Sequence, residues 1–409
     1  MLDTLRSVLR FRRFEFDSTK RRLASAANTD DLRRLAKRRL PAGVFDYIDG
    51  GAEDEVAMRA NRDAFGRYEF CPRVLRDVST VDTSSTLLGA PLPFPLVLAP
   101  TGYTRIADPQ GELAVARAAQ RSGVPYTLST MSTRSIEEVA EAGGTGRRWF
   151  QVYVWRDRAL VRDMVERAAA AGYEALVITV DTASLGRRER DVRRGFTLPP
   201  KLGLETILDG ITHPGWTWRF ARSEPILFAN VATSKVGGNQ YDGSRPIALA
   251  EKVSSQFDPA LSWADIEWFR SMWNGPIVLK GVQSVADARL AVEHGIDAIA
   301  LSNHGGRQLD SAPAILELVA PVAQEVGGSI EIICDGGVRR GSDMVKALAL
   351  GANACMVGRA YLYGLGAAGE AGVDRVLEWL LDELRRTMAL IGATTIADID
   401  SEHVRRRPT

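Results

Sequence analysis

The sequence predicts an α/β protein built as a (β/α)8 TIM barrel, with a helical extension before the barrel and one long insertion after its fourth strand. Eight short apolar runs recur along the chain, amphipathic segments lie between them, and polar residues follow every run. Apolar runs without alternation are typical of strands buried on both faces of a parallel sheet. An open doubly wound sheet is the alternative, and the lack of a GxGxxG motif after the first run weakens it.

The expected strands are short and evenly spaced except at one point. Segments such as "GELAVARAAQRSG" and "SVADARLAVEHG" between them end in glycine, which is a helix-stop signal. Residues 30–66 are expected to form helices packed outside the barrel. The strands are predicted at 95–100, 125–130, 148–154, 175–181, 276–282, 298–304, 331–337 and 354–359.

The spacing breaks between the fourth and fifth strands, where about ninety residues intervene. Part of this stretch, "SWADIEWFRSMW", has a helical pattern. The rest, about 186–258, is rich in glycine, proline and serine with scattered aromatic residues. A long irregular segment of this kind is typical of a lid, a binding loop or disorder.

We divide the chain into a basic extension at 1–29, a single domain at 30–400 with its barrel over about 95–375, and a basic tail at 401–409. Residues 1–40 carry twelve Lys/Arg and five Asp/Glu, yet the net charge of the chain is only +1. That balance gives no global basic field for nucleic acid. No apolar run is long enough for a signal peptide or a transmembrane helix. The three cysteines show no CxxC spacing, which favours a cytoplasmic protein with reduced thiols and neither a structural disulfide nor a metal site.

Polar and small residues end every predicted strand, at the edge where barrel enzymes place their chemistry. Taken singly, each has a structural explanation, such as a cap, a rim lysine or simple packing. A ring drawn from all eight strands is hard to explain as packing. It comprises Pro100, Thr101, Gly102, Ser129, Gln151, Tyr153, Thr179, Asp181, Lys280, Ser302, His304, Arg307, Asp335, Gly336, Gly337, Arg339, Gly358 and Arg359.

Glycines and arginines gather where the last two barrel helices are expected to begin, in "CDGGVRRGSD" and "MVGRAYLYG". Glycine lets backbone N–H groups close on an anion, and a helix N-terminus favours negative charge. Arginine adds bidentate pairing. The pattern therefore predicts a phosphorylated ligand at this edge.

Several motifs in one order resemble the FMN-dependent α-hydroxy acid dehydrogenase and oxidase family. The resemblance covers about residues 30–400 and includes "DYIDGGAEDE", "APTGYTR", "FQVYV", "ITVDT", "LGRRERDVR", "VLKGV", "SNHGGRQLD" and "VGRAYLYG". The N-terminal extension and "GRAYLYGLGAAGEAGV" resemble most the actinobacterial L-lactate dehydrogenase branch. The family resemblance implies FMN as cofactor, an L-2-hydroxy acid as substrate and a homotetramer.

The resemblance also implies roles for single residues. His304 would be the base, Asp181 would orient it, and Lys280 would lie beside N1 and O2 of the flavin. Either a hydride or a carbanion would carry the electrons. The substrate carboxylate and hydroxyl would be bound by Arg307, Arg188, Tyr47 and Tyr153. The isoalloxazine and ribityl chain would contact Pro100, Thr101, Gly102, Ser129, Gln151, Thr179 and Ser302, and the ribityl tail and phosphate would contact Asp335, Gly336, Gly337, Arg339, Gly358 and Arg359.

Two departures from the oxidases bear on specificity. Met131 replaces the tryptophan of glycolate oxidase, so we expect a different substrate pocket. Gly102 replaces the alanine that the oxidases tend to have, so we expect poor use of oxygen. The chain has neither a CxxCH motif nor iron–sulfur spacing, and we predict that electrons pass to a quinone or another small acceptor.

The basic N-terminus and "HPGWTWRFARSEPILF" are candidates for contact with an anionic membrane. In this reading the protein is cytoplasmic and peripheral at the inner face of the cell membrane. The alternative is a surface loop that packs on the barrel or on a neighbouring subunit. The candidate residues are Trp216, Trp218, Phe220 and Phe228 with Arg219 and Arg222.

Three other functions remain open at this point. The first is a 2-hydroxy acid oxidase that uses oxygen and releases peroxide. The second is an FMN barrel isomerase, against which the grouping of His304, Arg307 and Arg188 argues, because that set is typical of carboxylate binding. The third is a non-catalytic phosphate-binding barrel.

Overall fold

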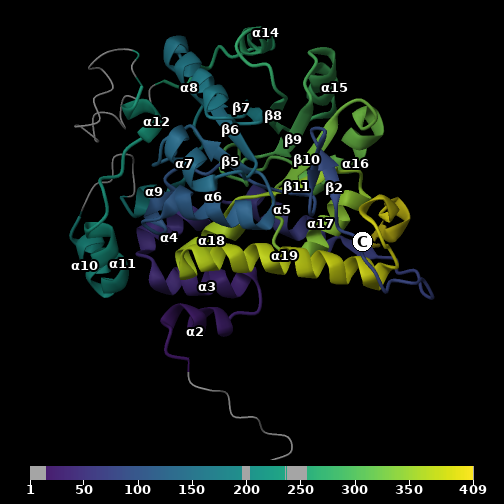
Figure 1. The fold of residues 1–409 in the computed structure, drawn as a ribbon, viewed down its shortest axis with the longest axis horizontal. Coiled ribbons are helices and arrows are strands. Elements are labelled where there is room, and N and C mark those ends of the chain that lie inside the picture. The colour runs from purple at the N-terminus through teal and green to yellow at the C-terminus, as the bar shows by residue number, and fades with distance from the viewer. Residues whose placement is uncertain (1–14, 196–202, 235, 237–255, 409) are drawn as a thin grey trace, which may run out of the picture.

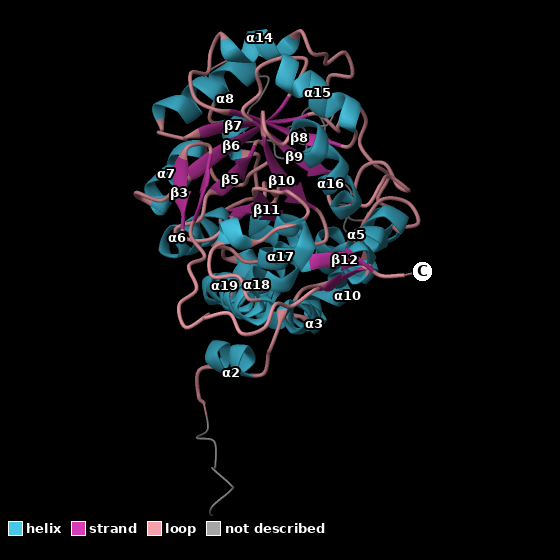
Figure 2. Cartoon of the chain, turned by 90° about the vertical axis from the view of Figure 1, so that its right-hand side faces the viewer, coloured by secondary structure: helices cyan, strands magenta, loops and turns pink. Residues whose placement is uncertain are grey.

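The computed structural model describes residues 15–195, 203–234, 236 and 256–408. Eight parallel strands close into a barrel in the order β10-β11-β4-β5-β6-β7-β8-β9, with helices around it (Figures 1 and 2). Every barrel strand falls inside a predicted run, so the predicted fold class is confirmed. The strands are β4 (Leu96–Leu98), β5 (Tyr126–Ser129), β6 (Arg148–Tyr153), β7 (Ala175–Thr179), β8 (Ile277–Val282), β9 (Ala298–Ser302), β10 (Glu331–Asp335) and β11 (Ala354–Val357).

Helices follow the strands and bury one apolar face each on the barrel. The long helix α19 (Glu370–Ile391) packs against α6, α17 and α18 and is the yellow helix in the lower part of Figure 1, above α3. The helices after the strands are α6 (Gly111–Ser122), α7 (Ile136–Gly143), α8 (Arg158–Ala170), α15 (Val285–Glu293), α16 (Ile315–Val326), α17 (Gly341–Ala349) and α18 (Arg359–Ala368).

The N-terminal segment packs outside the barrel, as predicted. Helix α3 lies against α18, α4 touches α18, and α5 packs on α16. A short strand after α5, β1 (Tyr68–Phe70), pairs antiparallel with β12 (Val404–Arg406), which brings the C-terminal tail onto the same side. The helices are α2 (Ser18–Ala24), α3 (Thr29–Arg39), α4 (Ala42–Asp49) and α5 (Val56–Gly66).

The amino end of the barrel is closed by a hairpin of β2 (Ser85–Leu87) and β3 (Ala90–Leu92). Leu87 and Leu92 are buried there in one apolar cluster with Trp149 and Ile333. This end contains no part of the polar ring.

The insertion between β7 and β8 is more helical than its composition predicts. Pro214 opens α11 and Gly203 precedes α10, so residues typical of loops mark helix starts here. The predicted helix near 262–273 is shorter, as α14 (Asp265–Arg270). The other helices are α9 (Glu189–Arg193), α10 (Leu204–Thr212), α11 (Pro214–Ala221) and α12 (Ala229–Ala232). Within the part of the chain that the structure describes, no helix combines the length and hydropathy needed to cross a membrane.

Candidate active site

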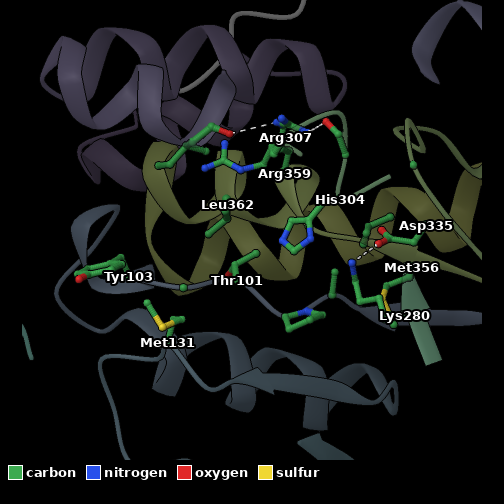
Figure 3. Close-up of a pocket in the computed structure, with 18 of the residues that line it drawn as sticks. Thr101, Tyr103, Met131, Lys280, His304, Arg307, Asp335, Met356, Arg359 and Leu362 are labelled. Carbon is green, nitrogen blue, oxygen red and sulfur yellow. Dashed lines mark hydrogen bonds and ion pairs between the residues drawn. The ribbon is translucent and has the colours of Figure 1, made fainter. Parts of the chain in front are cut away.

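A cavity of about 170 Å³ opens at the carboxyl end of the barrel (Figure 3). It brings together residues from loops that are far apart in the sequence. Most of the predicted site residues line it, namely Tyr47, Pro100, Thr101, Gly102, Met131, Tyr153, Arg188, Lys280, His304, Arg307, Asp335, Gly336, Gly337, Arg339, Gly358 and Arg359.

His304 projects into this cavity from an unusual turn. The φ angles of His304, Gly305 and Gly306 are +58°, +66° and +73°, so three successive residues adopt the left-handed conformation. A Cβ on Gly306 would lie 2.5 Å from the backbone nitrogen of Met58, so only glycine fits against the start of α5. The His304 N–H donates to Ser302 Oγ at 3.0 Å, which fixes the turn to the end of β9.

The imidazole of His304 lies between a carboxylate and a phenol. Its Nδ1 is 3.1 Å from Asp181 Oδ1, and its Nε2 is 3.5 Å from the Tyr153 hydroxyl. Burial alone would raise the pKa of Asp181, but the charge and hydrogen bond of His304, with the charge of Lys280, hold it below its usual value. An ionised carboxylate only accepts hydrogen bonds, so Nδ1 carries a proton and Nε2 faces the cavity as a potential proton acceptor.

Lys280 lies in a buried polar triad on the cavity wall. Its Nζ is 2.9 Å from Asp335 Oδ2 and donates to Ser302 Oγ at 3.1 Å, while Ser302 donates to Asp335 at 2.7 Å. Burial lowers the pKa of Lys280, but Asp335 and Asp181 raise it by more, so the net shift is upward. The amine therefore stays charged at the edge of the cavity.

Arginines give the rest of the cavity a positive potential. Arg307 donates to the carbonyl oxygens of Tyr47 and Gly50, and burial, together with the charges of Arg188 and Arg359, lowers its pKa to about 9. Among residues 15–195, 203–234, 236 and 256–408, no carboxylate lies at ion-pair distance from the guanidinium groups of Arg307, Arg339 and Arg359. These groups donate to backbone carbonyl oxygens. Uncompensated guanidinium groups around one cavity are suited to an anionic ligand.

The N-terminus of α18 adds to this anion site. Arg359 is its first residue, Gly358 precedes it, and within the described ranges no side chain caps the helix. Free first-turn N–H groups beside Arg339 and Arg359 fit a phosphate group. Gly337, which lies beside this anion site, must also be glycine for steric reasons, because a Cβ there would lie 2.1 Å from the carbonyl oxygen of Asn61 in α5.

Four predicted cofactor residues do not line the cavity. Ser129 donates to Gln151 Oε1 at 3.0 Å, and Gln151 Nε2 donates to Thr179 Oγ1 at 2.9 Å, so these three form a buried row behind it. Ser302, the fourth, bridges Lys280 and Asp335. Their direct contact with a flavin stays a prediction.

The sequence analysis missed several residues that shape the site. Tyr103, Leu185 and Phe257 line the cavity, and Phe257 packs edge to face on Tyr153 with ring centroids 5.1 Å apart. Tyr103 and Leu185 belong to the quoted motifs "APTGYTR" and "LGRRERDVR" and were therefore findable. Phe257 lies near the end of the insertion and carries no sequence signal.

A buried amide pair supports the histidine turn and was also missed. Asn61 Nδ2 donates to Asn303 Oδ1 at 2.7 Å, and Asn303 Nδ2 returns the bond at 3.1 Å. Asn303 Oδ1 also accepts from the N–H of Gly306 at 3.0 Å. The pair ties the turn that bears His304 to α5.

The profile of the FMN-dependent dehydrogenases matches residues 36–406. The chain belongs to the FMN-dependent dehydrogenase family. As a member of that family it is an FMN enzyme that oxidises 2-hydroxy acids, and the resemblance seen in the sequence is confirmed. The uncompensated arginines, the free N-terminus of α18 and the charged Lys280 fit this cofactor.

The names of similar proteins differ in the 2-hydroxy acid and include both dehydrogenases and oxidases. This chain is 46% identical over 98% of its length to a Mycobacterium tuberculosis protein provisionally named an L-lactate dehydrogenase, covering 94% of that protein. It is 43% identical over 92% of its length to glycolate oxidase 3 of Oryza sativa subsp. indica, covering 95% of that protein. The crystal structure of a monotopic membrane protein, (S)-mandelate dehydrogenase, superposes with a TM-score of 0.88 at 40% identity, over 94% of this chain and all of that one.

Proposed function

We propose that this FMN-dependent enzyme oxidises L-lactate to pyruvate and passes the electrons to a quinone or another acceptor that is not oxygen. The observation that carries the proposal is the meeting of the His304–Asp181 pair with Arg307 and Arg188 around one cavity. An enzyme that oxidises a small 2-hydroxy acid needs a base that takes a proton from the hydroxyl group or from the carbon that bears it. It also needs fixed cations that bind the carboxylate. The name of the mycobacterial relative supports lactate.

In the proposed mechanism His304 is the base that takes one proton from the substrate. Arg307 and Arg188 bind the substrate carboxylate, while Tyr47 and Tyr153 donate to its carboxylate and hydroxyl oxygens. His304 takes the proton at Nε2, and Asp181 stabilises the imidazolium that results, since its oxygens already lie 3.1 and 3.3 Å from Nδ1. FMN, when bound, would accept the two electrons together with the second hydrogen that the substrate loses.

The remaining cavity residues are proposed to hold the cofactor. Arg339 and Arg359, with the backbone at Gly336, Gly337 and Gly358, would bind its phosphate. Lys280 would place its charge beside the ring, where negative charge grows during the reaction. Asp335 would keep that lysine in position. The isoalloxazine and ribityl chain would lie against Pro100, Thr101 and Gly102, over the row of Ser129, Gln151 and Thr179 with Ser302.

Gly102 supports an acceptor other than oxygen. A Cβ there would lie 2.9 Å from Met131 Cβ, so the two departures from the oxidases touch each other. We propose that this glycine and Met131 together shape the space beside the flavin. The Gly102→Ala variant should reoxidise faster in air than the wild type; unchanged oxygen reactivity contradicts this role.

Steady-state kinetics test substrate and acceptor together. We expect kcat/KM for L-lactate to exceed that for glycolate and L-mandelate, with a soluble quinone as acceptor and little peroxide formed. Glycolate preference with stoichiometric peroxide would instead establish the oxidase alternative, which the name of the rice relative favours.

We also propose peripheral contact with the inner face of the cell membrane, through α10 and α11. These helices project from the barrel (Figure 1), and Ile207, Leu208, Ile211 and Trp218 expose 53%, 61%, 66% and 60% of their surface. Arg222 stacks on Trp218 with its guanidinium 3.8 Å from the ring centroid. Exposed aliphatic side chains with tryptophan and arginine are typical of interfacial helices.

The structure changes the set of residues offered for this contact. Phe228 is only 2% exposed and packs on Tyr103, so its prediction as a membrane residue is wrong. Trp216 donates to the carbonyl oxygen of Ile106 and stacks on Phe220, so it anchors α11 to the barrel. Residues 1–14 of the basic extension lie outside the described residues, while α2 places Arg22 near Arg219.

Vesicle sedimentation tests the membrane proposal. The double variant Ile207→Ser/Ile211→Ser should lose binding to anionic vesicles, whereas Leu75→Ser should not, although Leu75 is fully exposed on a different loop. Equal pelleting of all three proteins, or none by the wild type, contradicts the proposal. The homotetramer stays a prediction from the family resemblance, and light scattering checks it.

A further inference from the structure

A fully buried carboxylate lies behind the cavity without lining it. Glu112 is the second residue of α6 and is 0% exposed. An acidic residue in the first helical turn is ordinary at a surface, but burying one requires strong partners. Burial raises the pKa of Glu112, opposed by hydrogen bonds from Thr133 and by the charge of Arg105, which does not reach ion-pair distance.

The hydrogen bonds of Glu112 join two loops. Its Oε1 accepts from the N–H of Thr133 at 2.8 Å and from the N–H of Thr104 at 3.3 Å. The Thr133 hydroxyl lies 2.9 and 2.7 Å from the two carboxylate oxygens. Thr104 belongs to the loop after β4 and Thr133 to the loop after β5, so one side chain clamps both.

These are the loops that carry Gly102 and Met131. The two loops touch directly, because the N–H of Tyr103 donates to the carbonyl oxygen of Met131 at 3.1 Å. The first loop is fixed on its other side, because the Thr101 hydroxyl is 2.6 Å from the hydroxyl of Tyr361, which donates to the Ala99 carbonyl. Glu112 therefore adds a second link between the two loops, beside the Tyr103–Met131 backbone bond, and holds the Met131 loop to an anchored partner.

We propose that Glu112 is a positioning residue that determines substrate size. It holds Met131 against Gly102, and thereby limits the width of the cavity that receives the side chain of the 2-hydroxy acid. The inference rests on the proposed oxidation of a small 2-hydroxy acid. Removing the clamp lets the Met131 loop move outward, which admits a longer side chain.

The experiment compares Glu112→Ala with Glu112→Gln, which keeps the acceptor oxygen, and with Thr133→Val, which removes the hydroxyl donor. Glu331→Ala is the matched control, since Glu331 also braces a loop, accepting from the N–H of Leu88 at 2.6 Å, but at the amino end of the barrel. For each FMN-loaded variant, kcat/KM is measured for L-2-hydroxy-4-methylpentanoate and for L-lactate. Calorimetry gives the dissociation constants of the two corresponding 2-oxo acids, without turnover.

We expect Glu112→Ala to raise the ratio of kcat/KM, longer acid over lactate, by about tenfold or more, the scale on which pockets discriminate added methylene groups. The ratio of dissociation constants, longer 2-oxo acid over pyruvate, should fall, because a lower dissociation constant means tighter binding. Thr133→Val should shift both ratios less, and Glu112→Gln should stay near the wild type. Glu331→Ala should lower Tm and leave both ratios unchanged.

Ratios that stay at the wild-type value in Glu112→Ala and Thr133→Val overturn the inference, whatever happens to Tm. If Glu112→Ala does not fold, Thr133→Val decides the matter by the same criterion. A wild type that oxidises neither acid contradicts the proposed function instead, and the ratio of 2-oxo acid dissociation constants then still tests Glu112.

Discussion

The two ends of the barrel are built from the same strands but from opposite kinds of residue. On β6, Trp149 and Gln151 point to the same side because they are two residues apart, and the same holds for Val278 and Lys280 on β8. At the amino end this inner layer is apolar, as the cluster around Trp149 shows. Two residues further along β6 and β8 the layer becomes polar at Gln151 and charged at Lys280.

The amino end of the barrel therefore mainly stabilises the fold, whereas the carboxyl end carries the residues proposed for the reaction. Apolar packing at the amino end lowers the free energy of the fold with no desolvated charge. At the carboxyl end Lys280, Asp181 and Asp335 are buried, and buried ion pairs seldom add net stability. A fold that keeps such charges is using them for chemistry, and the four predictions below test this division in order of expected effect.

The largest effect is expected at the carboxyl end. His304→Asn keeps a residue that tolerates the left-handed φ of +58° but removes the proton acceptor. The value of kcat/KM should fall by about a hundred- to ten-thousand-fold, the range for a general base, while Tm stays nearly unchanged. Activity within a factor of a few of the wild type would remove His304 from the proposed mechanism.

At the amino end we expect a large loss of stability with little change in kcat/KM. Trp149 is fully buried, and Trp149→Ala should lower the free energy of unfolding by about 3–5 kcal/mol through lost burial and a cavity. Denaturant unfolding measures this, and kcat/KM per bound FMN should match the wild type. A large loss of kcat/KM in folded protein would show that the two ends are not separable.

An intermediate effect on stability is expected at Asp49, the last residue of α4, which links α4 to α3, α9 and α18 near the cavity arginines. Asp49 accepts from Arg33, Arg190 and Tyr363. Burial raises its pKa, but the hydrogen bonds from Arg33 and Tyr363, with the charges of Arg33 and Arg359, lower it from 3.8 to about 2. The folded pKa is below the unfolded one, so the stabilisation is complete above pH about 4 and is lost as the pH falls towards 2.

Asp49→Asn should therefore reduce the free energy of unfolding at pH 7 by about 2 kcal/mol, at roughly 1.4 kcal/mol per pKa unit. The gap between variant and wild type should narrow as the pH falls through this window. Chemical denaturation at several pH values gives the comparison, and a gap independent of pH would assign the loss to packing instead of charge.

The smallest effect is expected at the junction of the two loops above Glu112. Gly102→Ala places a methyl group against Met131 and should cost about 1 kcal/mol or more of stability through overpacking. Thermal unfolding of the variant beside its oxygen reactivity tells whether the contact acts on packing alone.

The sequence was sufficient for the barrel because buried parallel strands leave continuous apolar runs, and all eight were found. Its motifs also brought His304 and Lys280 to the cavity and Asp181 to His304, while their roles stay a prediction. Glu112 could not be found, because an acidic residue at a helix start is commonplace and only the fold brings Thr133 to it. The exposed face of α10 was missed because glycine and proline around a nine-residue helix resemble a loop.

The most direct test of the central claim is an anaerobic absorbance spectrum of the purified protein before and after addition of L-lactate. We predict the yellow spectrum of bound FMN, bleached by L-lactate and returning only slowly when air is admitted. A flavin spectrum that no 2-hydroxy acid bleaches would contradict the proposed oxidation, and bleaching by other 2-hydroxy acids but not by L-lactate would contradict the proposed substrate.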